Sequence, residues 1–441
     1  MTSIFIKTFG CSHNVADSEE LAYYLSNFGY TILGLENVTS HLSSSQSEYE
    51  LELLKQADLI IYNTCTVKNP SDDKFFTLLK RTNKPVVLAG CIPQSQVADE
   101  WLKDYSAIGV DNLDLIVEVV EGTLKGDVVH RLKKRKSLDD RELPIIRRNS
   151  FVAIIPILQG CLGSCTYCKT KQARGHLKSY PKETIIKQIR KAKHEGVKEI
   201  WLVSEDNGAY GKDIDSSLPD LLRNISYTVL NSDIMVRVGM LNPEYAFEYK
   251  IELAEIIKQD CFYKFLHIPI QCANDSVLKD MNRPYTTSQF KESFSYLREK
   301  IPDITLATDI ICGFPTESPE QFLDTLNYVK EEKFTVINIS KFYPRPKTPA
   351  ARMKLLPTHE VKRRSKELSD WFSGVNFNEP YVGQTLSVLF TEKGNVDGSF
   401  IGKTNNYRNV IVKSKKDILG MRFNVKIHST TRDDLRGEIV N

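Results

Sequence analysis

The sequence lacks any long hydrophobic run. Its longest apolar stretch, Phe151–Leu158, has about eight residues, whereas a helix that spans a bilayer needs about twenty. The first residues, Met1–Lys7, run straight into a strand pattern and do not have the layout of a secretory signal peptide. We therefore expect a cytoplasmic protein with no membrane partner.

The sequence also lacks the biases of fibrous and disordered chains. It has 22 glycines and 18 prolines in 441 residues, and 26% of its residues are charged, which excludes a collagen, a coiled coil and wholesale disorder. The length corresponds to two or three domains. Residues 1–124 are acidic, whereas residues 125–150 and 381–441 are basic. The basic run at 131–136 is typical of a solvated linker, although it could also contact phosphates.

Short apolar strands alternate with helices over residues 1–124, which predicts a domain with a parallel α/β sheet. The expected strands are Ser3–Lys7, Asp58–Asn63, Pro85–Ala89 and Ala107–Val110, and the expected helices are Asp17–Asn27, Glu48–Gln56, Ser71–Arg81 and Asn112–Glu121. Residues 125–150 are expected to form a basic linker.

The alternation restarts at residue 151 and continues to residue 380. The expected strands are Phe151–Leu158, Glu199–Val203, Ile234–Val238, Phe265–Ile270, Thr305–Ile311 and Thr335–Lys341. A full eight-unit barrel usually needs about 250 residues, so six units favour a partial (β/α)6 TIM-like barrel. An open doubly wound sheet is the alternative. In residues 381–441 the expected strands Thr385–Phe390, Val410–Lys413 and Arg422–His428 are joined by Gly-, Asn- and Asp-rich turns, which predicts a small all-β barrel.

Three of the nine cysteines, Cys161, Cys165 and Cys168, directly follow the first strand expected in the barrel. Three thiolates can hold three irons of a 4Fe-4S cluster, whereas ordinary electron carriers use four. The iron left open suits S-adenosylmethionine, whose amino and carboxylate groups can chelate it. Zinc is the alternative, and His176 is close enough in sequence to be considered as the fourth ligand that zinc would need.

A second set, Cys11, Cys65 and Cys91, is scattered in sequence, but each member lies just past an expected strand. The carboxyl ends of parallel strands share one edge of a sheet, and ligands bind outside that edge. These three thiols are therefore expected to converge. The alternative is that each is a small buried residue. Cys261, Cys272 and Cys312 show no mutual spacing and are expected to be structural.

The Cys-x3-Cys-x-aromatic-Cys spacing, with Tyr167 as the aromatic residue, is similar to the signature of the radical S-adenosylmethionine superfamily. The flanking Gln159-Gly160 and Gln172–Gly175 resemble its methylthiotransferase branch. So do the segments Thr8–Asn14, Asn63–Val67 and Ala89–Gln94. The resemblance implies that Cys11, Cys65 and Cys91 hold a second 4Fe-4S cluster that delivers sulfur to the substrate. His13 is a further ligand candidate, although it is read as a polar loop residue.

The resemblance also implies which other residues bind ligands. The amino group of S-adenosylmethionine is expected at Ser204, Glu205 and Asp206, and further contacts of this cofactor are expected at Tyr167, Gln271 and Gly313. The C-terminal module resembles a TRAM domain, a module that binds tRNA. Its expected tRNA contacts are Lys403, Tyr407 and Arg408, joined by Arg345 from the sixth unit of the barrel.

The stretch Ser204–Asp213 most resembles the eukaryotic and archaeal enzymes that act on threonylcarbamoyladenosine. The implied reaction inserts sulfur at C2 of N6-threonylcarbamoyladenosine-37 of tRNA after a 5′-deoxyadenosyl radical removes hydrogen. A second S-adenosylmethionine then methylates the sulfur. The implied partners are the anticodon loop of ANN-decoding tRNA, a flavodoxin- or ferredoxin-type reductant and a sulfur donor.

Two kinds of alternative stay open. One keeps the chemistry but changes the substrate to isopentenyladenosine in tRNA or to a ribosomal-protein aspartate. The other, from a different class, is a non-catalytic protein that transfers electrons through iron-sulfur clusters or only binds tRNA.

Overall fold

Six parallel strands in the order β2-β1-β3-β4-β5-β6 form the sheet of the N-terminal domain. The computed structural model describes residues 1–35, 44–66, 71–138 and 143–440. The strands are β1 (Ser3–Thr8), β2 (Thr31–Leu33), β3 (Leu59–Thr64), β4 (Val86–Gly90), β5 (Ser106–Ile108) and β6 (His130–Arg131). Strands β1, β3, β4 and β5 agree with the four predicted strands to within two residues, whereas the edge strands β2 and β6 were not predicted.

Helices cover both faces of this sheet. They are α1 (Ser12–Phe28), α2 (Ser44–Gln56), α3 (Ser71–Arg81), α4 (Cys91–Ser95) and α5 (Ile116–Leu124). Side chains alternate between the faces, so Ile4 packs with α1 and α5 on one side and Phe5 packs with α3 on the other. Strand β6 lies in the segment predicted as a basic linker, and residues 139–142 of that segment lie outside the described residues.

The central domain is a partial barrel of six parallel strands that follow one another in chain order. They are β7 (Val152–Pro156), β10 (Glu199–Val203), β11 (Met235–Arg237), β12 (Phe265–His267), β13 (Thr305–Cys312) and β14 (Val336–Lys341). They form two three-stranded sheets joined by a parallel bridge between Val236 and Phe262. A doubly wound sheet would reverse its strand order, so the (β/α)6 prediction is confirmed and the alternative is wrong.

Helices cover the outer face of the barrel. They are α7 (Lys182–His194), α8 (Leu218–Val229), α9 (Pro243–Glu248), α10 (Lys250–Ile257), α11 (Asp275–Asp280), α12 (Thr287–Lys300), α13 (Pro319–Glu332) and α14 (Thr358–Ser373). A short excursion follows β7 and comprises β8 (Leu158–Gln159), α6 (Thr170–Arg174) and β9 (Lys178–Ser179). None of the helices in the described parts of the chain is long and apolar enough to cross a bilayer.

The C-terminal domain is a closed five-stranded barrel in the order β15-β16-β17-β19-β18. Its strands are β15 (Thr385–Lys393), β16 (Ser399–Thr404), β17 (Asn409–Lys413), β18 (Arg422–Thr430) and β19 (Leu435–Val440). The small all-β barrel predicted for this region is therefore confirmed, with β16 and β19 in addition to the three expected strands.

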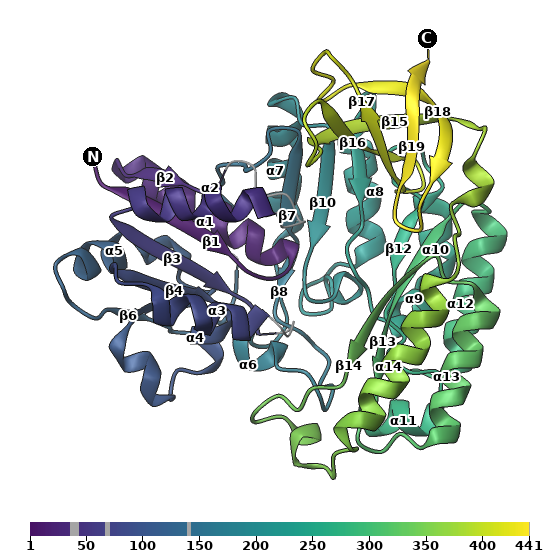
Figure 1. Ribbon diagram of the computed structural model, residues 1–441, viewed down its shortest axis with the longest axis horizontal. Helices are drawn as coiled ribbons and strands as arrows, with labels where there is room; N and C mark the ends of the chain where they lie inside the picture. Colours follow the sequence, from purple (N-terminus) through teal and green to yellow (C-terminus); the bar gives the residue numbers. More distant parts are fainter. Residues whose placement is uncertain (36–43, 67–70, 139–142, 441) are drawn as a thin grey trace.

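The two outer domains contact different parts of the central barrel: the N-terminal domain lies at its side, next to β7 and β8, and the C-terminal barrel lies at one end (Figure 1). The C-terminal barrel covers the amino ends of the strands, where Thr391 Oγ1 donates to Glu199 Oε1 at 2.7 Å and Thr305 Oγ1 donates to the carbonyl of Asn406 at 2.7 Å. The N-terminal domain packs α1 against β7, with Ala16 among Val152 and Ile154. Its loops reach the carboxyl ends of the barrel strands, where ligands bind in barrels of this kind.

Candidate functional site

Cys11, Cys65 and Cys91, here called the sheet cysteine set, lie at the carboxyl edge of three neighbouring strands. Cys65 directly follows β3, Cys91 directly follows β4, and Cys11 stands between β1 and α1. Because β1, β3 and β4 are adjacent and parallel, the structure brings these three cysteines together although they are far apart in sequence.

Asn14 lies among the three cysteines. Cys11 Sγ lies 3.4 Å from Asn14 Oδ1, and Asn14 Nδ2 lies 3.9 Å from Cys91 Sγ. The same Nδ2 donates to the carbonyl of Thr64, directly before Cys65, at 3.2 Å. Gly10 leaves the space that this arrangement needs, because a Cβ there would lie 2.4 Å from Cys65 Cβ and 3.0 Å from Cys65 Sγ.

Burial keeps the thiol of Cys91 protonated when no metal is bound. Cys65 and Cys91 are only 2% and 3% exposed, and burial raises the pKa of the Cys91 thiol to about 12. Metal ligation requires the thiolate. Occupation of the sheet cysteine set therefore releases protons.

Cys161, Cys165 and Cys168, the barrel cysteine set, lie in the loop between β8 and α6. A side chain built on Gly163 would lie 3.5 Å from Cys161 Sγ and 3.9 Å from Cys165 Sγ, so both sulfurs face the same point. Arg283 Nη1 donates to Cys165 Sγ at 3.2 Å. Burial raises the pKa of Cys161 and of Cys168 above that of a free thiol.

The three thiols of each cysteine set are compatible with the ligation of an iron-sulfur cluster. In the described parts of the chain, no three His, Cys, Asp or Glu side chains surround a point that one ion could occupy. A 4Fe-4S cluster places each thiolate on a different iron, so its ligands stand further apart than those of one zinc ion. His176, considered as a zinc ligand, is exposed, and His13 Nδ1 pairs with Glu205 Oε1 at 2.8 Å.

The three residues predicted to hold an ammonium group have different surroundings. Asp206 accepts hydrogen bonds from Asn242 Nδ2 at 2.7 Å and from the Gly208 amide at 3.2 Å, and burial raises its pKa to about 7. Ser204 Oγ accepts from the Asp206 amide at 3.2 Å. The Glu205 carboxylate instead pairs with His13 of the N-terminal domain and, at 3.1 Å, with Arg174 Nε.

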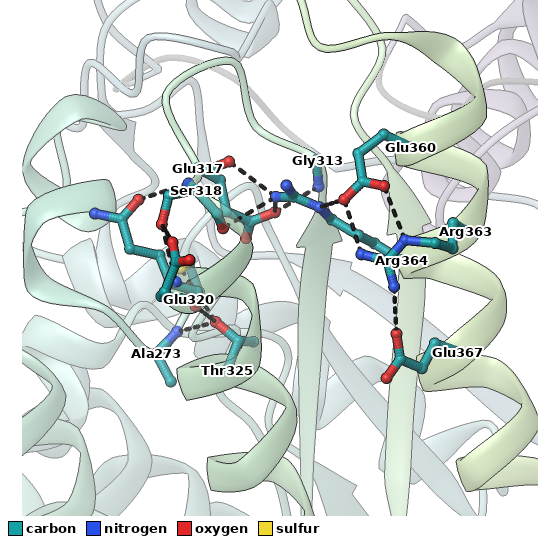
Figure 2. Close-up of polar contacts among 12 residues, drawn as sticks. Ala273, Gly313, Glu317, Ser318, Glu320, Thr325, Glu360, Arg363, Arg364 and Glu367 are labelled. Atoms are coloured by element: carbon teal, nitrogen blue, oxygen red, sulfur yellow. Dashed lines mark hydrogen bonds and ion pairs between the residues drawn. The ribbon is translucent and has the colours of Figure 1, made fainter.

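Gly313 forms the turn after β13, and a buried ion pair fixes that turn (Figure 2). Its amide donates to Glu317 Oε2 at 2.9 Å, and Arg364 Nη1 of α14 donates to the same oxygen at 2.8 Å. The φ of Gly313 is +80°, and a Cβ there would lie 2.8 Å from Val361. The turn therefore requires glycine, and α14 holds it through Arg364 and Val361.

Tyr167 and Gln271 lie near the same end of the barrel. Tyr167 packs edge to face on Phe314, with ring centroids 6.4 Å apart. Gln271 has a φ of +67°, and its amide donates to the Asp309 carbonyl at 2.8 Å. Both are close to Gly313 in the fold, since Phe314 follows it in sequence and Gln271 bridges to Ile310 of β13.

The residues predicted to bind tRNA are largely occupied by protein contacts. The Tyr407 ring lies 4.8 Å from that of Tyr263 and 4.9 Å from that of Phe265, in the interface between the two barrels. Lys403 Nζ lies 5.0 Å from the Tyr407 ring, and the Arg408 guanidinium lies 5.9 Å from the ring of Tyr381. Arg345 Nη1 donates to the carbonyl of Thr66, beside Cys65.

Asn14, Arg174 and Arg283, which all lie beside a cysteine set, were not predicted as site residues. Asn14 and Arg174 belong to segments quoted above for their resemblance, but only the fold shows their contacts. The sequence signal for such residues is a polar or charged side chain on a helix or turn next to a loop that contains a cysteine.

Three family models match the chain, each over one domain. The model of the radical SAM superfamily matches residues 155–329, that of the TRAM domain matches residues 379–440, and that of the uncharacterized protein family UPF0004 matches residues 33–108. Together they span the three domains of the fold.

Curated relatives are similar over almost the whole chain. Threonylcarbamoyladenosine tRNA methylthiotransferases of Drosophila melanogaster and Homo sapiens are both 42% identical over 99% of this chain, covering 78% and 74% of their own lengths. A probable enzyme of this name from Pyrococcus abyssi is 35% identical over 93% of this chain and 94% of its own.

Solved structures show the same fold at low sequence identity. The radical S-adenosylmethionine methyltransferase TsrM from Kitasatospora setae, with tryptophan substrate and a SAM analog bound, has a TM-score of 0.55 and 14% identity. The match covers 90% of this chain and 79% of that one.

Proposed function

The chain belongs to the threonylcarbamoyladenosine tRNA methylthiotransferase family, and from that premise we propose that it converts N6-threonylcarbamoyladenosine-37 of tRNA into its 2-methylthio derivative. The relatives that carry this name match all three domains. The observation that carries the proposal is the presence of two three-cysteine sets at one end of the barrel, each without a fourth cysteine.

We propose that Cys161, Cys165 and Cys168 hold a 4Fe-4S cluster and that Cys11, Cys65 and Cys91 hold a second one. When bound, these groups supply one-electron cleavage of S-adenosylmethionine at the barrel cysteine set and sulfur at the sheet cysteine set. This division explains why two sites with incomplete protein ligation stand together, because an open iron in each leaves room for a non-protein ligand.

The surrounding residues would bind and orient S-adenosylmethionine. Ser204, Glu205 and Asp206 remain the proposed contacts of its amino group, together with Tyr167, Gln271 and Gly313 for the rest of the molecule. An ammonium group beside Asp206 stabilises the ionised carboxylate, which burial otherwise disfavours. The ion pair between Glu317 and Arg364 would hold the Gly313 turn in place, because Glu317 also accepts from the Gly313 amide.

The N-terminal domain would exclude water from the reaction. Helix α1 packs over the inner face of β7, and its His13 reaches Glu205 just past the carboxyl end of β10. The proposed partners are the anticodon loop of ANN-decoding tRNA, a flavodoxin- or ferredoxin-type reductant and a sulfur donor, in the cytoplasm. Lys403, Tyr407, Arg408 and Arg345 remain the proposed tRNA contacts.

The test is mass spectrometry of tRNA nucleosides from cells that lack the gene. We expect the 2-methylthio derivative of threonylcarbamoyladenosine to disappear and to return with the wild-type gene but not with Cys161→Ala. Cys261→Ala is the matched control and restores it, because Cys261 belongs to neither set. Loss of methylthio-isopentenyladenosine instead supports the alternative tRNA substrate, and unchanged nucleosides in the deletion strain overturn the proposal.

A further inference from the structure

Four ionisable side chains from two domains meet between the cysteine sets. Arg174 Nη2 of α6 lies 2.5 Å from Asp17 Oδ2 of α1, and Arg174 Nε lies 3.1 Å from Glu205 Oε1. Glu205 Oε1 also lies 2.8 Å from His13 Nδ1. His13 and Asp17 belong to the N-terminal domain, whereas Arg174 and Glu205 belong to the central domain.

This cluster is almost completely removed from water. The side chains of Arg174, Asp17, His13 and Glu205 are 2%, 7%, 5% and 10% exposed. Burying charges costs several kcal/mol per ion unless each has a partner of opposite charge and good geometry. A buried ion cluster of this kind contributes little to stability. Its role is therefore sought in the cysteine sets that lie beside it.

Arg174 is close to the barrel cysteine set in sequence, and its charge acts on the sheet cysteine set. It lies six residues after Cys168, on the helix that follows the barrel cysteine set. Its positive charge acts on both Cys11 and Cys91 of the sheet cysteine set, and for Cys91 it is the largest charge effect. Its partner Asp17 lies one helical turn after Asn14, the residue that stands among the three sulfurs.

We propose that Arg174 is a positioning residue for the sheet cysteine set: it reaches across the domain boundary, fixes α1 through Asp17, and supplies the positive charge beside an iron-sulfur cluster held by Cys11, Cys65 and Cys91. The inference rests on the proposed function only in requiring that a cluster binds this set.

The position of Arg174 has an electrostatic consequence. Reducing a cluster adds negative charge, and a nearby cation stabilises the reduced form and raises the reduction potential. Removing the charge of Arg174 therefore lowers the potential of the cluster on the sheet set. Removing the negative charge of Asp17 leaves the positive charge of Arg174 less compensated, which raises the reduction potential of this cluster. The shifts in potential caused by the Arg174 and Asp17 changes therefore have opposite signs.

The experiment uses the full chain with Cys161, Cys165 and Cys168 changed to Ala, so that only the sheet cysteine set binds iron. Iron content and the midpoint potential, followed by electron paramagnetic resonance, are measured for the parent and for Arg174→Gln, Arg174→Lys and Asp17→Asn. We expect a lower potential for Arg174→Gln, a higher one for Asp17→Asn, and a value near the parent for Arg174→Lys, which keeps the charge.

Arg283→Gln is the matched control, because Arg283 is also buried beside a cysteine sulfur but in the barrel set. It leaves the potential of the cluster on the sheet set unchanged. A purely structural role for Arg174 predicts lost iron or unfolding in every variant, without opposite shifts and without rescue by Lys.

The outcomes separate this inference from the proposed function. Potentials that do not differ between the parent and the Arg174 and Asp17 variants overturn the inference and leave the proposed function intact. Should Arg174→Gln fail to fold, Asp17→Asn and Arg174→Lys still decide between the two roles through the sign of the shift. A parent that binds no iron overturns both the inference and the second cluster.

Discussion

Gly10 shows how one residue without a side chain makes room for a ligand set. Its φ is +115°, a conformation that other residues rarely adopt, and its Cα faces the Cβ of Cys65. Backbone and sulfur therefore approach each other more closely than any residue with a Cβ allows. The sheet cysteine set depends on this contact as much as on its thiols.

Replacing Gly10 by Ala places a methyl group 2.4 Å from Cys65 Cβ, and the cysteine must move. We expect the iron content of anaerobically purified protein to fall from about eight to about four per chain, since two 4Fe-4S clusters become one. The measurement is iron and protein quantification.

Gly29→Ala is the control, because Gly29 has a φ of +109° and nothing within 4 Å of the new methyl group. This variant bears the same backbone strain, about 1–2 kcal/mol, and keeps about eight irons. Equal iron loss in both variants would attribute the effect to strain and contradict the role of the contact with Cys65.

Strand ends made the convergence of Cys11, Cys65 and Cys91 predictable from sequence, whereas the barrel cysteine set was predicted from its spacing within one loop. A short apolar run followed by Cys predicts both the strand and the place of the cysteine at its end, and parallel pairing brings such ends together. Glu205 was less predictable. It too follows a strand, but its carboxylate pairs with His13 and Arg174, and those contacts depend on how two domains dock.

Helix α14 illustrates how an element outside the matched radical SAM segment supports the barrel mouth. Two neighbouring arginines of this helix differ sharply in environment (Figure 2): Arg364 is 1% exposed and pairs with Glu317, whereas the Arg363 side chain is 53% exposed and pairs with Glu360 and Glu367. The first pair holds the Gly313 turn, and the second lies on the surface.

Arg364→Met leaves the Glu317 carboxylate buried without its cation. We expect a loss of about 3–5 kcal/mol in the free energy of unfolding, together with weaker binding of S-adenosylmethionine because the Gly313 turn loses its support. Urea unfolding followed by tryptophan fluorescence measures the first effect, and equilibrium dialysis measures the second.

Arg363→Met, one residue away, is the matched comparison. Exposed ion pairs contribute at most about 1 kcal/mol, so this variant stays close to the wild type in both measurements. A similar loss in both variants would show that α14 acts through its helical stability rather than through the buried pair.

At the level of elements, the strands missed from the sequence share one property, which is a weak local pattern. β2, β6 and β9 have three, two and two residues, and β16 and β19 each contain a glycine. Short or glycine-containing strands are stabilised by their neighbours in the sheet more than by their own residues. Their existence follows from barrel closure and from edge pairing, which no short window of sequence contains.

At the scale of the whole molecule, the C-terminal barrel is attached to the central one by an aromatic interface. Tyr407 contacts Tyr263 and Phe265, and the Arg237 guanidinium lies 5.2 Å from the Tyr407 ring. An aromatic residue between charged neighbours on a turn has the same sequence pattern whether it stacks on a nucleic-acid base or on another domain. The structure gives Tyr407 the second kind of contact, and its binding of tRNA stays a prediction.

Tyr407→Ala removes the centre of this interface. We expect a loss of roughly 2–3 kcal/mol and faster release of a C-terminal fragment by limited proteolysis, because the two barrels separate more often. Tyr227 on α8 is 75% exposed. We expect Tyr227→Ala to change neither the free energy of unfolding nor the rate of fragment release. If Tyr407→Ala weakened tRNA binding while the proteolysis pattern stayed the same, the ring would instead act mainly on RNA.

The spacing of the two cysteine sets along the chain has a consequence for the order of assembly. The barrel set spans 161–168 and belongs to one loop, whereas the sheet set spans 11–91 and exists only after three βα units have paired. Bringing distant ligands together costs loop-closure entropy that the folded sheet must first supply. The barrel set can therefore be formed by a local segment during synthesis, while the sheet set has to wait for a finished N-terminal domain. For the second cluster proposed above, folding of the N-terminal sheet must therefore precede loading of the cluster.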